Sequence, residues 1–488
     1  MHKSLLALVV MTAACVGAPA YQPPTVPIAP AYTVANAGVA ARLSTDTCPA
    51  DSSVRIGGAP VHFATALPGA PFWQIIHDSV LSALVEQALQ ANTDVRVAET
   101  RLTSSRTSRR LAAFDLVPTV TASGSAVRQQ LSIAQLPGAT RQFPEQQLWD
   151  VGFDASWELD IFGRVSRNVQ AQGAFVASAQ HALADVQVSV AAEVARTYFE
   201  LRGAQQQLAV AQRNADNQRR TVALTQDRLS GGRGTAFDTE RAKSILYLTL
   251  ATMPGLEAQI AQDQHRIAVL LGRAPEMLPK ELLIDDTLPR LPDTLNIGSP
   301  AELVRRRPDV LRAERQLAAR QLLVGVAKAE YLPRLTLGAR AGYAATSFDS
   351  LSRAGTSRLL VGPIVSWPLF DLGRVKERVD LAHAEADEAQ VEHTATVLRA
   401  LEETEGALTS YDRAHARLAI LDEAVRSSAR AAALAQQRFA AGLTDFLQVL
   451  DAERTLLDAE NQLALGHTSA ATALVAVYKA VGGTWPVR

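Results

Sequence analysis

One stretch of this sequence occurs twice, and the duplication limits how the chain can fold. Residues 306–343 repeat an earlier segment, residues 91–127, without a gap. Six residues recur at one interval, since 309 − 94 = 215: Asp94, Ala98, Glu99, Leu102, Ala112 and Pro118 return as Asp309, Ala313, Glu314, Leu317, Ala327 and Pro333. The repeat predicts one structure built from two similar halves, where 488 residues alone would suggest roughly three domains.

The N-terminus has the layout of a secretory signal. His2 and Lys3 precede a short apolar run, residues 5–11, and small residues follow it. The run is too short to span a bilayer, and no later stretch supplies 18 uninterrupted apolar residues. We therefore expect an exported chain whose contact with a membrane uses strands or lipid.

Cys15 stands where this signal ends, in the segment TAAC at 12–15. The segment resembles a bacterial lipobox, in which leucine usually stands where Thr12 is here. The resemblance implies a signal peptide of residues 1–14 and a lipid-anchored N-terminus at Cys15. The alternative is cleavage after the segment APA at 18–20, which would remove Cys15.

The remaining composition argues against catalysis and nucleic-acid binding. The 48 Lys and Arg residues balance 49 Asp and Glu residues, so no basic surface for nucleic acid is indicated. Cys48 has no CxxC or histidine partner, and the scattered histidines form no HExxH motif. We expect no enzyme activity, no metal and no cofactor.

Four segments alternate apolar and polar residues with the period of a β-strand. The clearest runs from Trp149 to Leu159, where every odd-numbered residue is apolar, and the others are 119–127, 335–343 and 359–369. Each is about 10 residues long, which is the length of a tilted membrane strand. A soluble antiparallel sheet with one wet face would show the same alternation.

The number of strands favours a membrane sheet that several chains share. One chain offers two hairpins, 118–159 and 333–369, and so four strands. A sheet in lipid has to close because unpaired edges are costly there, and four strands cannot enclose a lumen. Several chains must therefore each contribute four strands, and three chains would give twelve.

Each hairpin is followed by a long helical segment. About 65 residues without proline come after Gly163 and after Gly373, enough for a helix of about 100 Å. Apolar residues recur every seven positions in both segments, a narrow stripe that suits coiled-coil packing. They are Val194, Leu201, Leu208, Ala215, Val222 and Leu229 in the first and Tyr411, Leu418, Val425, Ala432 and Phe439 in the second.

The duplicated parts divide the chain. A helix is expected from Ile75 to Ala113, and return helices from Asp238 to Leu271 and from Asp445 to Val481, with Pro254 kinking or splitting the first of these. Each repeat then runs helix, hairpin, long helix, return helix. The predicted order is a proline-rich extended tether (15–74), the first repeat (75–274), a linker (275–300) and the second repeat (301–488).

Together these features resemble the TolC/OprM family of outer-membrane efflux proteins, in particular its NodT-like lipoprotein branch. The resemblance covers nearly the whole chain after the signal. It rests on RPDV at 307–310, SWPLFD at 366–371, LDAE at 450–453 and VYKAVGGTW at 477–485. MPGLE at 253–257 also looks like that branch, so Pro254 is a feature of the family.

The resemblance implies an α+β membrane protein that forms a TolC-like homotrimer. Its 12-stranded outer-membrane β-barrel, with four strands per chain, would continue as an α-helical coiled-coil barrel through the periplasm. The implied function is a passive duct for small molecules in a tripartite efflux system, fed by an RND-type inner-membrane transporter through a periplasmic adaptor. The residues also allow a pore-less periplasmic coiled-coil lipoprotein, an adaptor or scaffold, which would not explain the four alternating segments.

Two residues of the second return helix are candidates for a gate. Leu447 and Asp451 lie four residues apart on one helical face. In similar proteins these positions line the closed periplasmic end. A ring of three carboxylates would repel itself and attract cations, so Asp451 is expected to bias opening and selectivity. The alternative is an ordinary surface acid paired with Arg454.

The turns that end the long helices are candidates for contact with the adaptor. Gly232 and Gly442 allow the chain to reverse. The resemblance implies that the surrounding tip also meets the helical hairpins of the adaptor. The residues concerned are Arg228, Leu229, Ser230, Arg438 and Phe439.

Overall fold

The computed structural model describes residues 27–33, 61–64, 71–130, 132, 141, 144–283, 288–289, 291–292 and 294–483. They fall into two compact units. The first unit holds Arg101–Gln180 and Arg312–Thr394. The second holds the described parts of Val26–Thr100, His181–Leu311 and Ala395–Arg488. The lipidation candidate Cys15 lies outside the described residues.

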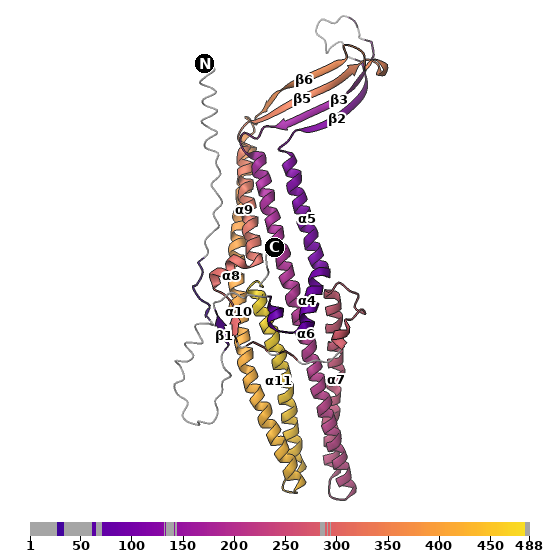
Figure 1. Ribbon diagram of the computed structural model, residues 1–488, viewed down its shortest axis with the longest axis vertical. Coiled ribbons are helices and arrows are strands. Elements are labelled where there is room, and N and C mark those ends of the chain that lie inside the picture. The colour runs from indigo at the N-terminus through magenta and orange to yellow at the C-terminus, as the bar shows by residue number, and fades with distance from the viewer. Residues whose placement is uncertain are drawn as a thin grey trace. The chain divides into compact units, whose positions relative to one another are not determined.

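The first unit contains one antiparallel sheet of four strands, in the order β2-β3-β5-β6 (Figure 1). The strands are β2 (Thr119–Gln129), β3 (Gln146–Glu158), β5 (Arg334–Ala345) and β6 (Ser357–Ser366). All four alternating segments therefore form strands, although β6 ends before Trp367 and Leu369 because Pro368 follows.

The two faces of this sheet differ in chemistry. On one face lie Asp150 and Asp154 of β3 with Arg340 of β5 and Arg358 of β6, joined by ion pairs between Arg340 and Asp154 (2.7 Å) and between Arg358 and Asp150. The opposite face is apolar yet exposed. It carries Phe153, Leu359, Val361 and Val365, which are 62%, 76%, 61% and 66% exposed.

The two hairpins have the same register. Thr119 pairs with Ser156 in the first, and Arg334 pairs with Ser366 in the second. The offset between the hairpins is thus 215 residues for the leading strand (334 − 119) and 210 for the returning strand (366 − 156). The duplication seen in the sequence is therefore a duplication of backbone pairing.

Four long helices each begin in one unit and end in the other. They are α5 (Thr93–Phe114), α6 (Arg164–Ser230), α9 (Pro308–Ala329) and α10 (Leu372–Ala440). The two that follow the hairpins contain 67 and 69 residues, as the proline-free segments predict. In the first unit, Ser178 of α6 donates to the carbonyl of Arg312 in α9, and Arg320 of α9 pairs with Glu385 of α10 at 2.7 Å.

The second unit contains the return helices α7 (Ala236–Leu270) and α11 (Phe446–Ala480), and the shorter helices α3 (Phe72–Ile75), α4 (Ser79–Ala91) and α8 (Pro300–Arg306). Its largest core joins α4, α6 and α11. Leu201 of α6 and Leu474 of α11 are fully buried there, and the ring of Phe72 stacks on Tyr478 at 5.1 Å. Most residues of the two heptad stripes are buried or half-buried, whereas Leu229 is exposed.

Three details differ from the expectation. The helix expected from Ile75 to Ala113 is divided after Ile75 and again at Asn92, because Asn92 takes an extended conformation and its side chain caps α5. Short strands β1 (His62–Ala64) and β4 (Thr294–Asn296) pair in parallel within the segments expected to be tether and linker. Pro254 does not split α7, which runs continuously through it.

No helix in the described part of the chain is both long enough and apolar enough to cross a membrane.

Candidate functional site

The turns after α6 and α10 are the same helix-ending motif. Gly232 and Gly442 have positive φ, 69° and 75°, which glycine adopts without steric strain. The amide of the residue after each glycine donates to a carbonyl five residues earlier, Arg233 to that of Arg228 and Leu443 to that of Arg438, both at 2.9 Å. This is the Schellman arrangement, so both glycines have the structural role that the sequence indicates.

Caps on the return helices fix the other side of each turn. Thr235 accepts a hydrogen bond from the amide of Asp238 at 3.2 Å, and Asp445 accepts one from the amide of Gln448 at 3.1 Å. Each turn is therefore bounded by a Schellman motif and a side-chain cap, which leaves few residues free to change conformation.

Two of the predicted tip residues come together although they belong to different turns. The guanidinium of Arg228 lies over the ring of Phe439, 4.2 Å from its centroid. Phe439 in turn lies 5.4 Å from Phe446, the first residue of α11. Phe446 belongs to a small core with Val222 and Leu246, so the tip aromatic pair continues into the packing of α6, α7 and α11.

The other predicted tip residues remain on the surface. Leu229 is 39% exposed, and the hydroxyl of Ser230 donates to the carbonyl of Asp227 at 2.9 Å. Arg438 is exposed, and no ion pair to it occurs in the described part of the chain. These side chains are thus available for contact, whereas Arg228 and Phe439 have an intramolecular role as well.

The two gate candidates lie on the exposed side of α11. Val449 and Leu450 face the small core near the turns, while Leu447 is 40% exposed and Asp451, one turn further, is exposed. Asp451 forms no ion pair with Arg454 or any other described residue. The alternative, in which Asp451 is a surface acid paired with Arg454, is therefore not observed within the described part of one chain.

Sequence reasoning missed the counterpart of Asp451 in the first repeat. With the offset of 210 residues, Asp451 corresponds to Arg241 and Leu447 to Phe237, which is 65% exposed. The equivalent positions of the two return helices thus carry opposite charges. The duplication would have revealed this pair had it been followed into the return helices.

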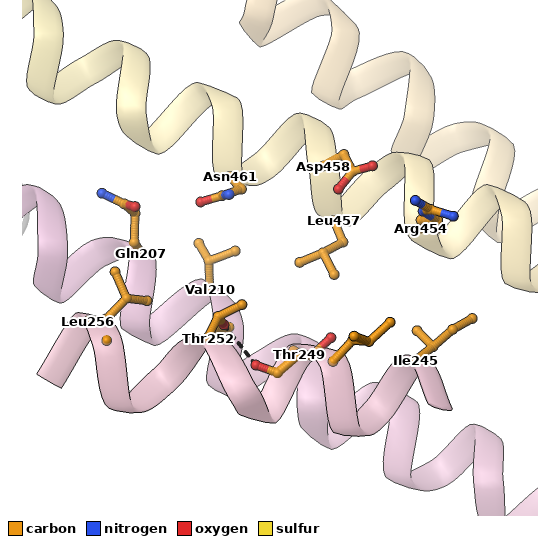
Figure 2. Close-up of a pocket in the computed structure, with 13 residues that line it drawn as sticks. Gln207, Val210, Ile245, Thr249, Thr252, Leu256, Arg454, Leu457, Asp458 and Asn461 are labelled. Carbon is orange, nitrogen blue, oxygen red and sulfur yellow. Dashed lines mark hydrogen bonds between the residues drawn. The ribbon is translucent and has the colours of Figure 1, made fainter. Parts of the chain in front are cut away.

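A cavity of about 490 Å³ lies in the second unit between α11 and the pair α6–α7. Figure 2 shows Arg454, Leu457 and Asp458 of α11 across from Ile245 and Thr249 of α7. The helices contact one another near the turns, and α6 and α11 meet again in the largest core, at Leu201 and Leu474, so the cavity lies between two regions of contact. The α6–α7 and α10–α11 pairs are consequently not packed together along their full length.

Arg307 and Asp309, from the RPDV segment at 307–310, lie at the start of α9. Asp309 is in the first turn of α9, while the Arg307 side chain is only 9% exposed. It pairs with Asp309 at 2.9 Å and with Glu403, and donates to the carbonyls of Ala400 (3.2 Å) and Ala480 (3.0 Å). Arg307 therefore joins α9, α10 and the end of α11.

Among the described residues, no group of histidine, cysteine, aspartate or glutamate side chains is arranged to hold a metal ion. The features that the structure does contain are an exposed apolar sheet face, long helices and ordered turns.

Comparison with known proteins agrees with this architecture. A model of the family described as outer membrane efflux protein matches residues 84–273 and 300–483. The solvent efflux pump outer membrane protein SrpC of Pseudomonas putida is 30% identical over 427 residues, which cover 87% of this chain and 89% of that protein. The probable efflux pump outer membrane protein TtgC of the same species is 29% identical over 497 residues, covering 99% and 96%.

Solved structures share the fold. The outer-membrane channel OprN superposes with a TM-score of 0.84 at 37% identity, covering 96% of this chain and all of that one. A membrane protein from Pseudomonas aeruginosa superposes with the same TM-score at 27% identity, with the same coverage.

Proposed function

This chain belongs to the outer membrane efflux protein family, and we propose that three copies of it form one tube through the outer membrane and into the periplasm. The chain is an outer-membrane efflux duct with a TolC-like fold. Each copy would supply four of twelve strands to a closed barrel, and the long helices would continue the wall of the tube.

The observation that carries this proposal is the sheet of the first unit. Its apolar face is exposed, with Leu359 and Val361 at 76% and 61%, and no described strand pairs with the outer edge of β2 or β6. An isolated chain would thus leave backbone groups unpaired in lipid, which costs several kcal/mol for each group. Closure with neighbouring copies removes both edges, with the apolar face toward lipid and the charged face toward the lumen.

The proposal is tested by extracting the protein from outer membranes in mild detergent and measuring its mass and its conductance in a planar bilayer. The expected result is a trimer that forms ion-conducting channels. Val361→Arg, on the apolar face, should reduce membrane insertion, while Leu360→Arg, on the charged face of the same strand, should insert normally. A stable monomer that inserts into no membrane would refute the proposal.

The partners follow from the same function. A duct in the outer membrane has no energy source of its own, so export requires an inner-membrane transporter, which we expect to be of the RND type, and a periplasmic adaptor. The exposed turn residues Leu229, Ser230 and Arg438 support contact with the adaptor. Crosslinking in cells followed by purification would identify both partners.

The gate is proposed at Leu447 and Asp451. Both side chains are exposed on α11 in a single chain, and three copies would bring three of each around one axis. Three unpaired carboxylates around a narrow opening repel one another and attract cations. The gap between α11 and the α6–α7 pair leaves room for the α10–α11 pair to shift when the end opens.

A lipid at Cys15 would add a second attachment to the outer membrane. The support is the lipobox-like segment at 12–15, followed by a proline-rich segment that can extend over the surface. An acyl chain contributes about 0.8 kcal/mol for each buried CH₂ group. The barrel would remain the main anchor, and the lipid would place the N-terminus at the periplasmic surface of the membrane.

A further inference from the structure

The last turns of α5 carry positive charge that nothing nearby compensates. Residues 100–114 include four arginines and no acidic residue, and residues 164–184 of α6 also contain no Asp or Glu. Arg106, Arg109 and Arg110 are all exposed, and none of them forms an ion pair within the described part of the chain. The Arg110 guanidinium donates to the hydroxyl of Thr107 at 3.1 Å. A chain with a net charge of −1 thus concentrates cations at one place.

These three arginines line one cavity of the first unit. The cavity has a volume of about 440 Å³ and lies between α5 and α6. Its α6 wall is largely aliphatic and includes Val169 and Val176. Arg109 lies beside Gly173 of α6, where an added Cβ would stand 3.6 Å from its Nε. Guanidinium groups on one side and aliphatic groups on the other fit an anion that is attached to an apolar body.

The cavity opens on the side of α5 that continues the apolar face of the sheet. Arg334 of β5 lies on the charged face together with Arg340, and it pairs at 3.3 Å with Glu330, the residue that follows α9. The counterpart of Glu330 is Asp115 (330 − 215), the residue that follows α5. At about 100° per residue, Arg106 stands about 180° from Asp115 around the helix. The arginines are therefore on the opposite side from the charged face.

The cavity also lies at the depth of lipid headgroups. The indole of Trp157 donates at 3.0 Å to the carbonyl of Leu116, just after α5, and tryptophan at the end of a membrane strand marks the membrane–water interface. Arg110 and Arg106 come four and eight residues before the end of α5, about 6 and 12 Å along the helix. A headgroup layer is about 5–8 Å thick, and arginine side chains extend toward it.

We propose that the pocket formed by Arg106, Arg109 and Arg110 binds the phosphate of an anionic phospholipid, such as phosphatidylglycerol, in the periplasmic leaflet of the outer membrane. This inference rests on the proposed function, because only a chain inserted in that membrane brings the pocket to the leaflet. A guanidinium group donates two parallel hydrogen bonds to phosphate oxygens, and Val169 and Val176 cover the apolar part of the lipid. The bound lipid fills the gap between α5 and α6 at the membrane end.

A comparison of two lipids tests the proposal on the unmodified protein. The complete assembly, purified in mild detergent and stripped of lipid, is titrated with phosphatidylglycerol or with zwitterionic phosphatidylethanolamine, and bound lipids are counted by native mass spectrometry. We expect up to one phosphatidylglycerol per chain, bound at least about tenfold more tightly than phosphatidylethanolamine, since each arginine beside an anionic lipid changes affinity by about fivefold. Equal affinity for the two lipids would overturn the proposal.

Replacing the three arginines tests where the lipid binds. The pocket variant carries Arg106→Gln, Arg109→Gln and Arg110→Gln, and its affinity for phosphatidylglycerol should fall by up to about a hundredfold, to that of phosphatidylethanolamine. Lysine at the same three positions keeps the charge but loses the planar fork, so the loss should be intermediate. No loss in the glutamine variant would show that the pocket is not the site.

A charge-matched variant provides the control. Arg213→Gln, Arg219→Gln and Arg220→Gln remove the same charge from exposed positions of α6 in the second unit. This variant should bind phosphatidylglycerol as the unmodified protein does. A loss equal to that of the pocket variant would mean that overall charge, and not the pocket, attracts the lipid.

Two further outcomes separate the source of the anion and the fate of the proposed function. Inorganic phosphate in large excess should leave phosphatidylglycerol bound, whereas displacement would show that the pocket takes a soluble anion. If the unmodified protein forms conducting trimers but does not prefer phosphatidylglycerol, only this inference fails. If it forms no trimer and inserts into no membrane, the proposed function fails as well. The lipid preference of the unmodified protein needs no variant, so a variant that does not assemble leaves the test intact.

Discussion

Arg228 lies 4.2 Å from the ring centroid of Phe439, a contact that ties the turn after α6 to the turn after α10. A cation over an aromatic ring contributes about 0.5–1 kcal/mol at an exposed site. Arg228→Gln should therefore leave the trimer intact but loosen the tip, and reduce copurification of the adaptor by roughly two- to fivefold, as that energy implies. The measurement is the amount of adaptor recovered after crosslinking in cells.

Arg233→Gln provides the control for this prediction. Arg233 is in the same turn and exposed, but it has no aromatic ring beneath it in the described part of the chain. An equal loss of adaptor in both variants would show that net charge at the tip is responsible and that the Arg228–Phe439 contact is not.

We expect divalent cations to block the unmodified channel, and Asp451→Ala should abolish this block and raise the conductance of the closed channel. A ring of three carboxylates binds cations at the constriction, and without them no ion is held in the opening. Single-channel recordings with and without a divalent salt provide the measurement. Asp458→Ala, on the same helix but beside the cavity between the helix pairs, should leave the block in place. An unchanged closed current in Asp451→Ala would contradict the gate.

Cys15→Ser should abolish labelling of the protein by a radioactive or clickable fatty acid. Only the acylated cysteine of a lipoprotein carries the label, and the barrel strands should keep the unlabelled variant in the membrane. Labelling that persists in the variant would refute lipidation at Cys15. Absence of labelling in the unmodified protein would favour cleavage after residue 20.

The elements with strong periodicity were predictable from the sequence. The alternation from Trp149 to Leu159 corresponds closely to β3, and the proline-free segments correspond to α6 and α10. Period and length are local properties, so they survive folding unchanged. The Schellman turns at Gly232 and Gly442 were predictable for the same reason.

The contacts that depend on the third dimension were not predictable. The strand β1 is three residues long and exists only because it pairs with β4, more than 200 residues later. The division of the first helix at Asn92 depends on a hydrogen bond from its side chain to the carbonyl of Leu270, at 2.9 Å. The meeting of Arg228 and Phe439 likewise depends on how two turns pack, which neither turn encodes alone.

Asp263 should make the protein less stable as the pH rises. It is 6% exposed, one of its carboxylate oxygens has no partner, and burial raises its pKa above the usual value. The folded state therefore holds the proton more tightly than the unfolded state. The destabilisation is full above the folded pKa and is relieved as the pH falls through it.

Asp263→Asn removes the buried charge and tests this sign. Gln259, whose amide donates to Asp263 at 2.9 Å, can still donate to the amide oxygen. Above the folded pKa the variant should be more stable by about 1 kcal/mol, the lower end of the penalty for an unsatisfied buried group. Thermal unfolding in detergent at pH 5 and pH 7.5 would measure the difference. A variant that is less stable at both values would mean that the ionised carboxylate is needed.

Arg307 and Asn92 are counterparts in the two repeats, and both hold the end of a return helix. Arg307 donates to the carbonyl of Ala480 at the end of α11, and Asn92 donates to that of Leu270 at the end of α7. Arg307→Met would remove one donor from the carbonyls of Ala400 and Ala480, which keep the Thr404 hydroxyl, and would leave Asp309 and Glu403 without their cation. The expected loss is about 3 kcal/mol, the lower end of the cost of removing one partner of a buried ion pair, because Glu403 is 57% exposed and remains solvated.

Three further variants separate the contributions at this position. Arg307→Lys keeps the charge but not the planar fork, so its loss should be intermediate. Asn92→Ala should cost about 1–2 kcal/mol, because it removes one buried hydrogen bond and the cap of α5. Arg306→Met, at the exposed neighbouring residue, should change stability by less than about 0.5 kcal/mol. The order of thermal midpoints in detergent is the measurement, and an Arg307→Met variant as stable as Arg306→Met would show that the contacts of Arg307 do not hold the helices together.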